Sequence, residues 1–315
     1  SDLSNYRPIS ILTAVSKVIE KVYNAQLNPF LHQILSEFVA AFRQHYSCQS
    51  ALLRLVEDWK KSLDKREFIG TILMDLSKAF DCIPHDLLTA KLHAYGMTND
   101  SIQLLASYLR NRKQQVRVGN TFSNWAFLTK GVPQGSILGP AIFNIFINDL
   151  YFTITKASLV NFADDNTIFT SGKNLDQITT ILLHETNLAI DWFKINQMQA
   201  NADKFQAMIV SYRPHEIDYL NLENHNIKCE NHVKLLGVWL DNKLNFDKHI
   251  SELCLKASRQ LNALKRLSSY LNESTKMCIY KSFILCHLNY CPLIWHFTSK
   301  SNVLKLEKPD RKSVV

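Results

Sequence analysis

Glycine and proline are scarce in this chain, with eight of each among 315 residues. Linkers and low-complexity tracts are rich in such residues, so we expect neither. Long apolar runs are also missing, and the most apolar stretch, AIFNIFI, is far too short to cross a bilayer. No internal repeat with a period of roughly 20 to 50 residues is present, which excludes solenoids and propellers. We therefore expect a globular protein without a membrane span.

Paired cysteines are lacking as well. The chain has seven cysteines, an odd number, at irregular spacings and without a C-x-x-C motif. A disulfide framework is therefore not expected, and a reducing intracellular setting fits better. Cys286, His287, Cys291 and His296 form one cluster that invites a zinc interpretation. The spacing is unlike that of known zinc sites, and the two cysteines diverge on a helix, so we expect buried core thiols instead.

The remaining composition is that of a folded protein, with 46% hydrophobic and 20% charged residues. The formal net charge is +8 and the pI is about 9.0. Residues 1–170 carry 17 Lys or Arg and 14 Asp or Glu, whereas residues 245–315 carry 12 and 5. This basic end indicates either a polyanion partner or an ordinary solvated helical face. The chain begins SDLSNYRPIS, with neither an initiator Met nor a signal sequence, so we expect a fragment of a longer protein.

Hydrophobic periodicity gives a coarse map of the chain. It predicts helices at 11–31, 50–64, 85–96, 100–112, 141–151 and 175–196, and nearly continuous helix over 246–285. Short apolar runs predict strands at 68–76, 113–120, 205–212 and 233–241, and a strand–turn–strand unit over 157–172. The mixture predicts an α+β catalytic body over residues 1–240, followed by a helical part over residues 241–315.

Two adjacent carboxylates stand where the pattern otherwise reads as core. Asp164 and Asp165 lie in the turn of LVNFADDNTIF, and Asp75 ends the apolar run at 68–76. If these strands are neighbours, the acids converge at one edge of a sheet, where they cannot stay ionised without cations. Two Mg²⁺ ions about 3.5–4 Å apart would resolve the conflict and build a phosphoryl-transfer site. The alternative is a polar hairpin tip without a metal.

Several longer segments favour the two-metal interpretation over the hairpin tip. MDLSKAFDCIPHDLL (74–88), GVPQGSILGPAIFNIFINDL (131–150) and FADD (162–165) resemble motifs A, B and C of reverse transcriptases, in order and spacing. NYRPIS (5–10), NADKF (201–205), KLLGVWLD (234–241) and HLNYCPLIW (287–295) resemble the motif before the fingers, motif D, the primer-grip region and the end of the thumb. The chain is similar to reverse transcriptases of non-LTR (LINE-type) retrotransposons, of the jockey and CR1 kind.

The resemblance implies a right-hand polymerase with fingers, a palm built on an antiparallel sheet, and a helical thumb. It implies an RNA-directed DNA polymerase, part of a retrotransposon polyprotein, that extends a DNA primer on an RNA template with dNTP substrates. Two Mg²⁺ ions, with Mn²⁺ as a substitute, would be its cofactors. We expect it inside the cell, in the nucleus and cytoplasm as a ribonucleoprotein. Nothing in the sequence indicates an oligomeric state.

The resemblance also assigns roles to individual residues. Asp75 and Asp164 match the two principal metal ligands, Asp165 matches the third carboxylate, and the backbone carbonyl of Leu76 is a further ligand. Phe80 matches the side chain that excludes a 2′-hydroxyl, and Gln134 and Gly135 match the loop that packs against the nucleotide and template. Arg43 matches a triphosphate ligand, and Lys204 matches the general acid for the pyrophosphate leaving group. Plain core packing for Phe80 and a surface position for Lys204 stay open.

Three positions depart from the family pattern. Ala41 stands where Gly is usual, Asn166 where Thr usually follows FADD, and Phe205 where Thr usually follows the motif D lysine. None removes a metal ligand, but they leave open a decayed or repurposed copy that binds nucleic acid without polymerising. Another palm polymerase, such as an intron maturase or an RNA-templated RNA polymerase, is a further alternative.

The basic end of the chain also has a predicted arrangement. Leu253, Ala257, Leu261 and Leu264 fall on one face of a helix. The basic residues fall largely away from that stripe: Lys256, Arg259, Lys265 and Arg266. We expect the apolar face to pack within the thumb and the basic face to bind phosphates of the template–primer duplex.

Overall fold

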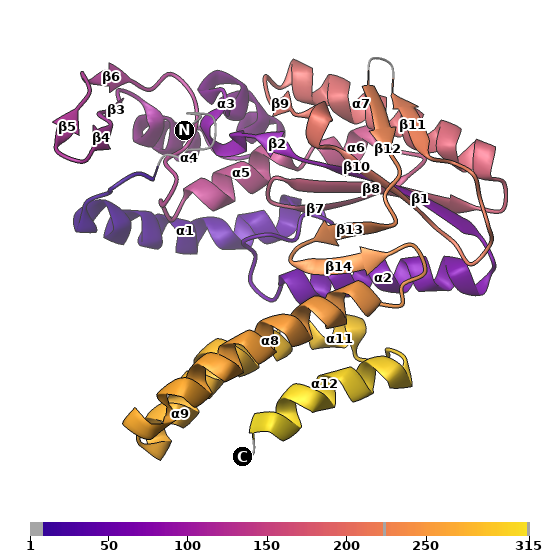
Figure 1. The fold of residues 1–315 in the computed structure, drawn as a ribbon. Helices are drawn as coiled ribbons and strands as arrows, with labels where there is room; N and C mark the ends of the chain where they lie inside the picture. Colours follow the sequence, from indigo (N-terminus) through magenta and orange to yellow (C-terminus); the bar gives the residue numbers. More distant parts are fainter. Residues whose placement is uncertain (1–8, 223–224, 314–315) are drawn as a thin grey trace. The chain divides into compact units, whose positions relative to one another are not determined.

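The computed structural model describes residues 9–222 and 225–313 (Figure 1). The chain forms two compact units that are interleaved in sequence. Among the described residues, the first contains 9–46, 73–168 and 183–205, and the second contains 47–72, 169–182, 206–222 and 225–313. The main sheet and one long helix continue from one unit into the other, so neither unit is a simple stretch of chain.

The first unit is mostly helical apart from the sheet. Its helices are α1 (Ala14–Ile34), α3 (His85–Ala94), α4 (Asn99–Leu109), α5 (Gly139–Ile147) and α6 (Leu150–Thr153), with short 3-10 helices η2 (Ala79–Asp81) and η3 (Ala202–Lys204). Its strands are β2 (Leu76–Ser77), β3 (Lys113–Gln114), β4 (Arg117–Val118), β5 (Thr121–Phe122), β6 (Ala126–Phe127), β7 (Ser158–Phe162) and β9 (Gln199–Ala200). Three elements continue into the second unit: β1 (Phe68–Met74), β8 (Asp165–Gly172) and α7 (Leu175–Ile195).

The second unit contains the C-terminal helices. Its strands are β10 (Gln206–Val210), β11 (Tyr219–Leu222), β12 (His225–Lys228), β13 (His232–Leu235) and β14 (Val238–Asp241). Its helices are α2 (Cys48–Asp64), α8 (Asp247–Leu267), η4 (Ser268–Tyr270), α9 (Glu273–Ile279), the π-helix η5 (Tyr280–Leu285), α10 (Cys286–Leu288), α11 (Pro292–Trp295) and α12 (Lys300–Ser313). No helix in the described residues is long and apolar enough to span a membrane.

The main sheet has four strands in the order β10-β1-β8-β7. Only two residues join β7 to β8, so these strands form an antiparallel hairpin. Two glycines lie beside Ile178: Gly70, near the start of β1, and Gly172, at the end of β8. A Cβ added at Gly70 would be 3.9 Å from the Ile178 side chain, and one added at Gly172 would be 3.0 Å from it. Strands β1 and β8 therefore run antiparallel, and the end of β1 lies beside the start of β8.

Helices cover both faces of this sheet within the second unit. Phe169 of β8 packs edge-on against Trp59 of α2, with ring centroids 6.0 Å apart. On the other face, Ile178 of α7 forms a buried cluster with Phe68 of β1 and Ile209 of β10. Because side chains alternate along a strand, a sheet covered on both faces needs apolar residues at nearly every position. This explains why β1 reads as a continuous apolar run.

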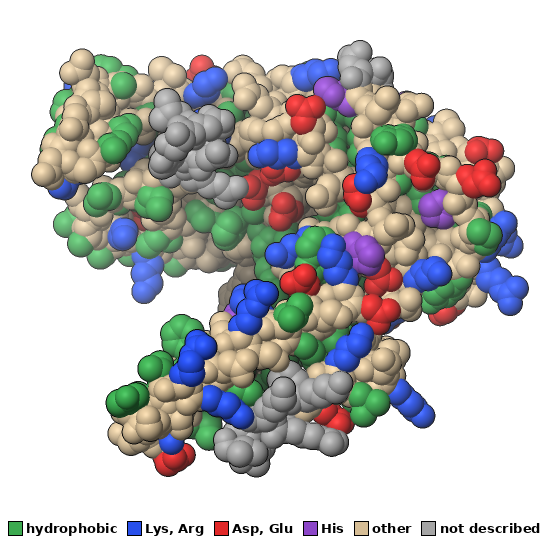
Figure 2. All heavy atoms as spheres, in the orientation of Figure 1, with side chains coloured by type: hydrophobic (Ala, Val, Ile, Leu, Met, Phe, Trp, Pro, Cys, Tyr) green, Lys and Arg blue, Asp and Glu red, His purple; other side chains and the backbone are tan. Residues whose placement is uncertain are grey.

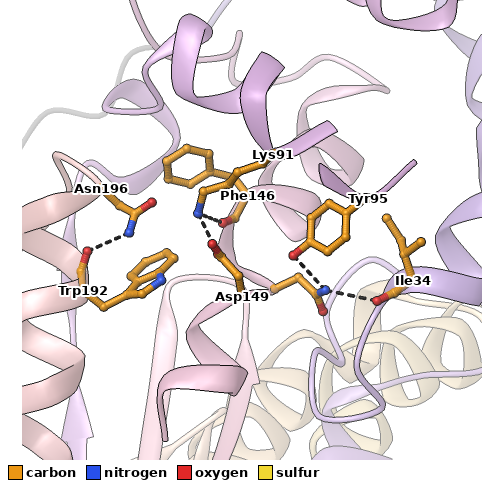
Figure 3. Close-up of polar contacts among 8 residues, drawn as sticks. Ile34, Lys91, Tyr95, Phe146, Asp149, Trp192 and Asn196 are labelled. Atoms are coloured by element: carbon orange, nitrogen blue, oxygen red, sulfur yellow. Dashed lines mark hydrogen bonds and ion pairs between the residues drawn. The ribbon is translucent and has the colours of Figure 1, made fainter. Parts of the chain in front are cut away.

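A buried lysine ties α3 to its neighbours in the first unit (Figure 3). Lys91 Nζ donates to the carbonyl of Phe146 at 2.9 Å and lies 2.6 Å from Asp149 Oδ1. Its ammonium also lies over the rings of Phe146 and Trp192, at 4.3 and 4.5 Å from their centroids. Burial lowers the pKa of Lys91, while Asp149 acts in the opposite direction. A buried cation that is paired in this way fixes how α3, α5 and α7 pack.

Most predicted elements are confirmed. The helix predicted at 141–151 is divided into α5 and α6, and two predicted strands also need correction. The predicted strand at 113–120 is instead two two-residue strands, β3 and β4, separated by a break. The predicted strand at 233–241 is a hairpin, in which β13 and β14 are joined by Leu236 and Gly237. Both joining residues have positive φ, 46° and 83°, which is the geometry of a two-residue hairpin turn. The apolar letters on either side of the turn concealed it in the sequence.

The helical end of the chain follows the prediction closely. Leu253, Ala257 and Leu261 are buried along α8, and the cluster of Ala257, Leu261 and Ile284 also receives the partly buried Leu264. The cysteine prediction is half right. Cys291 is buried, but Cys286 is exposed. The two cysteines do not share a helix: Cys286 begins α10, which ends at Leu288, and Cys291 has a φ of 47° just before α11.

Candidate active site

Asp75 lies between two strands with different partners. It follows the last residue of β1 and precedes β2, which pairs with β9 in the register Leu76↔Ala200. The Asn201 amide donates to the Asp75 carbonyl at 3.2 Å, so Asp75 and Asn201 are a hydrogen-bonded pair. Hydrogen-bonded and non-bonded pairs alternate in an antiparallel ladder, so the Leu76 carbonyl is directed away from β9. That direction suits the predicted use of this carbonyl as a ligand.

The FADD turn is held by two asparagines. Asn161 Nδ2 donates to the Ala163 carbonyl at 2.7 Å and to Asn166 Oδ1 at 2.9 Å. Asn166 Nδ2 in turn donates to the Asp164 carbonyl at 3.1 Å. Ala163 has a φ of 57°, a left-handed conformation that costs energy in a residue with a Cβ. Asn166 is 1% exposed, so its departure from the family pattern has a structural role in this turn.

The strand order brings the acids to neighbouring positions. The end of β1 precedes Asp75, the start of β8 is Asp165, and these strand ends lie side by side in the first unit. Asp165 is exposed, whereas Asp75 and Asp164 are half-buried. Carboxylate and carbonyl oxygens are the donors that Mg²⁺ prefers, so the donor set fits the expected metal. Within residues 9–222 and 225–313, however, no three His, Cys, Asp or Glu side chains lie close enough together to hold one ion.

Lys204 reaches the site from the segment after β9. It ends η3, and its Nζ lies 3.6 Å from Asp75 Oδ2. The lysine side chain is 62% exposed and that of Asp75 36%, so the pair is screened by water and adds little to stability. The structure therefore brings the predicted general acid and a predicted metal ligand together. Phe205, the next residue, is 7% exposed, so its departure from the family pattern is explained by core packing.

Phe80 lies in η2 between two other rings. It stacks on Phe143 of α5 with centroids 4.5 Å apart, and it meets Phe42 edge-on at 6.1 Å. Its side chain is half-buried, so one part packs and another part is accessible. The sequence presented packing and sugar exclusion as alternatives, but this position allows both. The two aromatic partners were not predicted, because nothing in the sequence links Phe42 and Phe143 to Phe80.

The PQG loop is attached to the motif A segment. Gln134 Nε2 donates to Asp81 Oδ2 at 2.9 Å. Burial raises the pKa of Asp81, while this hydrogen bond and nearby Lys78 oppose the shift. Gly135 has a φ of 100°, which only glycine adopts without strain, and the Gln134 carbonyl accepts from the Ser10 amide at 2.9 Å. Residues 5–8 of the NYRPIS motif lie outside the described residues.

A buried glutamate, which was not predicted from the sequence, also holds this loop. Glu20 of α1 is 1% exposed. Its Oε2 accepts from the amides of Ile137 and Leu138, at 2.7 and 3.3 Å, just before α5. A carboxylate at the N-terminus of a helix satisfies amides that lack an intrahelical partner. The signal was present as a lone acid among helical residues, but its partner lies 117 residues away in the sequence.

Arg43 is engaged with its own loop. Its Nη1 donates to the carbonyls of Ser36 and Val39 at 2.6 and 2.9 Å. Its guanidinium carbon lies 4.4 Å from the centre of the Tyr46 ring. Ala41, which stands in the place of the usual glycine, is fully buried, and its carbonyl accepts from Asn144 at 2.7 Å. The Arg43 side chain is therefore bonded to its own loop, and triphosphate binding by Arg43 stays a prediction.

The predicted basic residues of the thumb lie on α8. Lys256, Arg259, Lys265 and Arg266 are all exposed and lie outside the buried stripe of the same helix. Lys and Arg side chains are visible along α8 in Figure 2. The helix is therefore amphipathic, with its cations available to solvent, as predicted. Binding of phosphates by this face is not tested by the structure.

Comparison with known proteins gives related sequences. The probable RNA-directed DNA polymerase from transposon BS of Drosophila melanogaster is 28% identical over 96% of this chain. The RNA-directed DNA polymerase from mobile element jockey of the same species is 25% identical over 97% of it. In both cases the match covers 35% of the relative, so the chain spans about a third of their length.

The chain also has similarities to a solved structure and to a family model. A telomerase from Candida tropicalis, in complex with a telomeric RNA fragment, matches 95% of this chain and 51% of its own at 13% identity. Its TM-score is 0.46, too low to define a common fold. The family model for reverse transcriptase (RNA-dependent DNA polymerase) matches residues 1–240, which is most of the chain. The chain therefore belongs to the reverse transcriptase family.

Proposed function

We propose that this chain is the polymerase part of a non-LTR retrotransposon protein and extends a DNA primer on an RNA template. The observation that carries the proposal is the position of Asp75 and Asp165 at adjacent ends of β1 and β8 in a chain of this family. Phosphoryl transfer is catalysed mainly by positioning and by charge stabilisation. Paired carboxylates at one edge of a sheet supply what such a site needs.

Asp75, Asp164, Asp165 and the Leu76 carbonyl would hold the divalent cations. Bound there, Mg²⁺ supplies the Lewis acidity that activates the primer 3′-hydroxyl and neutralises the triphosphate. Lys204, beside Asp75, carries the proton that the departing pyrophosphate requires. Phe80 offers a rigid ring, held by Phe143, against the sugar of the nucleotide. Gln134, fixed by Asp81, keeps the PQG backbone in place beneath the base pair.

The setting of the reaction belongs to the same proposal. The partners are an RNA template, a DNA primer and deoxynucleoside triphosphates, with template sequence read by base pairing. The exposed cations of α8 would hold the duplex through its phosphates. An intracellular location, in the nucleus and cytoplasm as a ribonucleoprotein, agrees with seven free cysteines.

Primer extension on poly(rA)/oligo(dT) with dTTP and Mg²⁺ tests the proposal. We expect products longer than the primer with the wild-type chain and none with Asp75→Ala. Retained RNA binding without extension would show a repurposed copy. Extension with ribonucleotides in preference to deoxynucleotides would show an RNA polymerase instead. Either result contradicts the proposed reaction.

A further inference from the structure

A basic and aromatic hairpin projects from the first unit between motifs A and B. Strand β3 pairs with β6, and β4 pairs with β5, so residues 112–128 form one interrupted antiparallel ribbon. None of residues 110–130 is buried, and only Arg112, Gln115 and Leu128 are even partly covered. A two-stranded ribbon without a core is marginally stable in water. Such a segment is therefore expected to serve a contact rather than the fold.

The charge of this hairpin has one sign. No Asp or Glu occurs between Asp100 and Asp149. All five cations of that interval fall on or next to the hairpin: Arg110, Arg112, Lys113, Arg117 and Lys130. A solvated surface usually mixes both signs, so a stretch of 48 residues without an acid is unusual in a chain with 20% charged residues. The matching partner is a polyanion.

Large aromatic rings lie among these cations. Phe122, Trp125 and Phe127 are 56%, 65% and 63% exposed, and Figure 2 shows hydrophobic side chains at the surface in this region. Two of the rings are paired with a cation directly across the ribbon. Lys113 Nζ lies 4.5 Å from the centre of the Phe127 ring, and the Arg117 guanidinium lies 5.4 Å from that of Phe122. Each ring is thus held in place while much of its surface faces solvent.

Exposed rings among cations are the chemistry of single-strand binding. Every base has a face that stacks on an aromatic ring, and cations bind the phosphates between the bases. A duplex keeps its bases stacked on one another, so it cannot use the rings in this way. A membrane would accept the rings and cations too, but the hairpin offers no apolar helix face for insertion. Single-stranded nucleic acid is therefore the partner that uses both features.

The hairpin is connected directly to the candidate active site. Its second arm continues through Lys130, which bridges to Pro84, and Gly131, whose amide donates to the Ile83 carbonyl at 2.7 Å. From Phe127 to Gln134 the chain can span at most about 25 Å. A strand bound on the hairpin is therefore close to the nucleotide being copied.

We propose that the hairpin at residues 110–130 binds the single-stranded part of the RNA template, with Trp125 as the principal stacking residue. The proposal rests on the proposed polymerase function, because it names which part of that substrate the hairpin holds. It gives the hairpin affinity without sequence preference, since stacking and phosphate contacts read no base identity.

Binding without catalysis provides the test. Fluorescence anisotropy would compare a labelled RNA–DNA hybrid carrying a 5′ RNA overhang with the same hybrid made blunt, without dNTPs. We expect Trp125→Ala to weaken binding of the overhang hybrid at least fivefold and to leave the blunt hybrid unchanged. Trp125→Tyr, which keeps an aromatic face, should restore most of the affinity. Phe152→Ala is the matched control, because Phe152 is equally exposed at 65% in the same unit.

Several outcomes would overturn the inference. Unchanged overhang affinity in Trp125→Ala would show that the hairpin does not touch the template. An equal loss for the blunt hybrid would assign the hairpin to the duplex. A loss of binding to anionic vesicles, with RNA binding unchanged, would assign it to a membrane. Primer extension by the wild-type chain is scored separately, so failure of the polymerase proposal is distinguishable from failure of this one.

Discussion

Lys204 Nζ and Asp75 Oδ2 lie 3.6 Å apart, although 129 residues separate them in the sequence. The predicted proton donor therefore contacts a predicted metal ligand directly. Because water screens this pair, its contribution to folding is small, and we expect that either residue can be changed without unfolding the chain. Their separate roles in catalysis are therefore open to mutation.

The first prediction separates these two roles. Asp75→Ala should reduce primer extension to less than a few per cent, because the variant lacks a predicted metal ligand. Lys204→Ala breaks the same ion pair but keeps the carboxylate, so it should slow extension by roughly 100-fold without abolishing it. Single-turnover rates at saturating nucleotide would measure both. Equal losses of extension rate in the two variants would mean that the ion pair itself is required, and would contradict separate roles in metal binding and proton donation.

The second prediction concerns Phe80 as a steric wall. If Phe80 is the predicted wall against a 2′-hydroxyl, Phe80→Val should admit ribonucleotides, because the ring is gone. Phe143→Leu removes the stacking partner but keeps the wall, so it should lower stability and preserve the preference for deoxynucleotides. The ratio of dNTP to rNTP incorporation, measured beside the denaturation midpoint, distinguishes the variants. An unchanged ratio in a folded Phe80→Val variant would leave Phe80 as a packing residue only.

The third prediction concerns the asparagine pair at the FADD turn. Asn166→Thr removes the acceptor of Asn161 and the donor to the Asp164 carbonyl. We expect a loss of about 1–3 kcal/mol in the free energy of unfolding, together with weaker extension. The double variant Asn161→Val/Asn166→Thr should cost less than the sum of the single changes, because neither buried amide is left unpaired. Additive losses in urea unfolding would contradict a coupled pair.

The fourth prediction concerns the basic face of α8. With about four phosphates neutralised, log K for a template–primer duplex should fall with log salt at a slope of roughly −3 to −4. Replacing Lys265 and Arg266 with Ala should reduce the magnitude of that slope by roughly two and shorten the products. The rate of single-nucleotide addition at saturating duplex should change little. A slope and product length that do not respond would leave α8 as a solvated face.

The fifth prediction concerns pH. Burial lowers the pKa of His249 to about 4, and Lys234 acts in the same direction. Its ring packs near Trp295 and is 5% exposed, so the folded chain holds it neutral while the unfolded chain protonates below about 6.5. The unfolded state then binds more protons between pH 6.5 and 4, and stability should fall by up to about 3 kcal/mol over that window. His249→Phe should show a smaller fall in urea unfolding between pH 7 and pH 5. An equal fall in both chains would assign the pH dependence to other groups.

The sequence predicted those helices and strands whose apolar residues follow a regular spacing or a continuous run. The buried stripe of Leu253, Ala257 and Leu261 on α8 and the apolar run of β1 were both readable from spacing. The positions of Asp75, Asp164 and Asp165 at strand ends followed from the same patterns. Elements that depend on positive φ at ordinary residues were not readable. Leu236 adopts a φ of 46° in the β13–β14 turn, and leucine gives no turn signal.

Contacts between distant segments were beyond reach of the sequence. Phe80 could be matched to a family role, but its stacking on Phe143 depends on how α5 packs. Asn166 looked like a loss of the usual residue, whereas the structure gives its amide two hydrogen bonds, and that amide extends one bond further from the backbone than a threonine hydroxyl. The effect of a residue that departs from a family pattern can therefore be judged only together with the residues that it contacts. For Asn166 that residue is Asn161.

The contact of Glu20 with the amides before α5 has a practical consequence for anyone who shortens this chain. Removing α1 would remove Glu20, which lies more than a hundred residues upstream of the loop that it holds. The PQG turn would then keep every one of its own residues and still lose its anchor. A trimmed protein with an intact set of recognisable motifs would therefore be inactive, and screening it by motif content alone would give no warning.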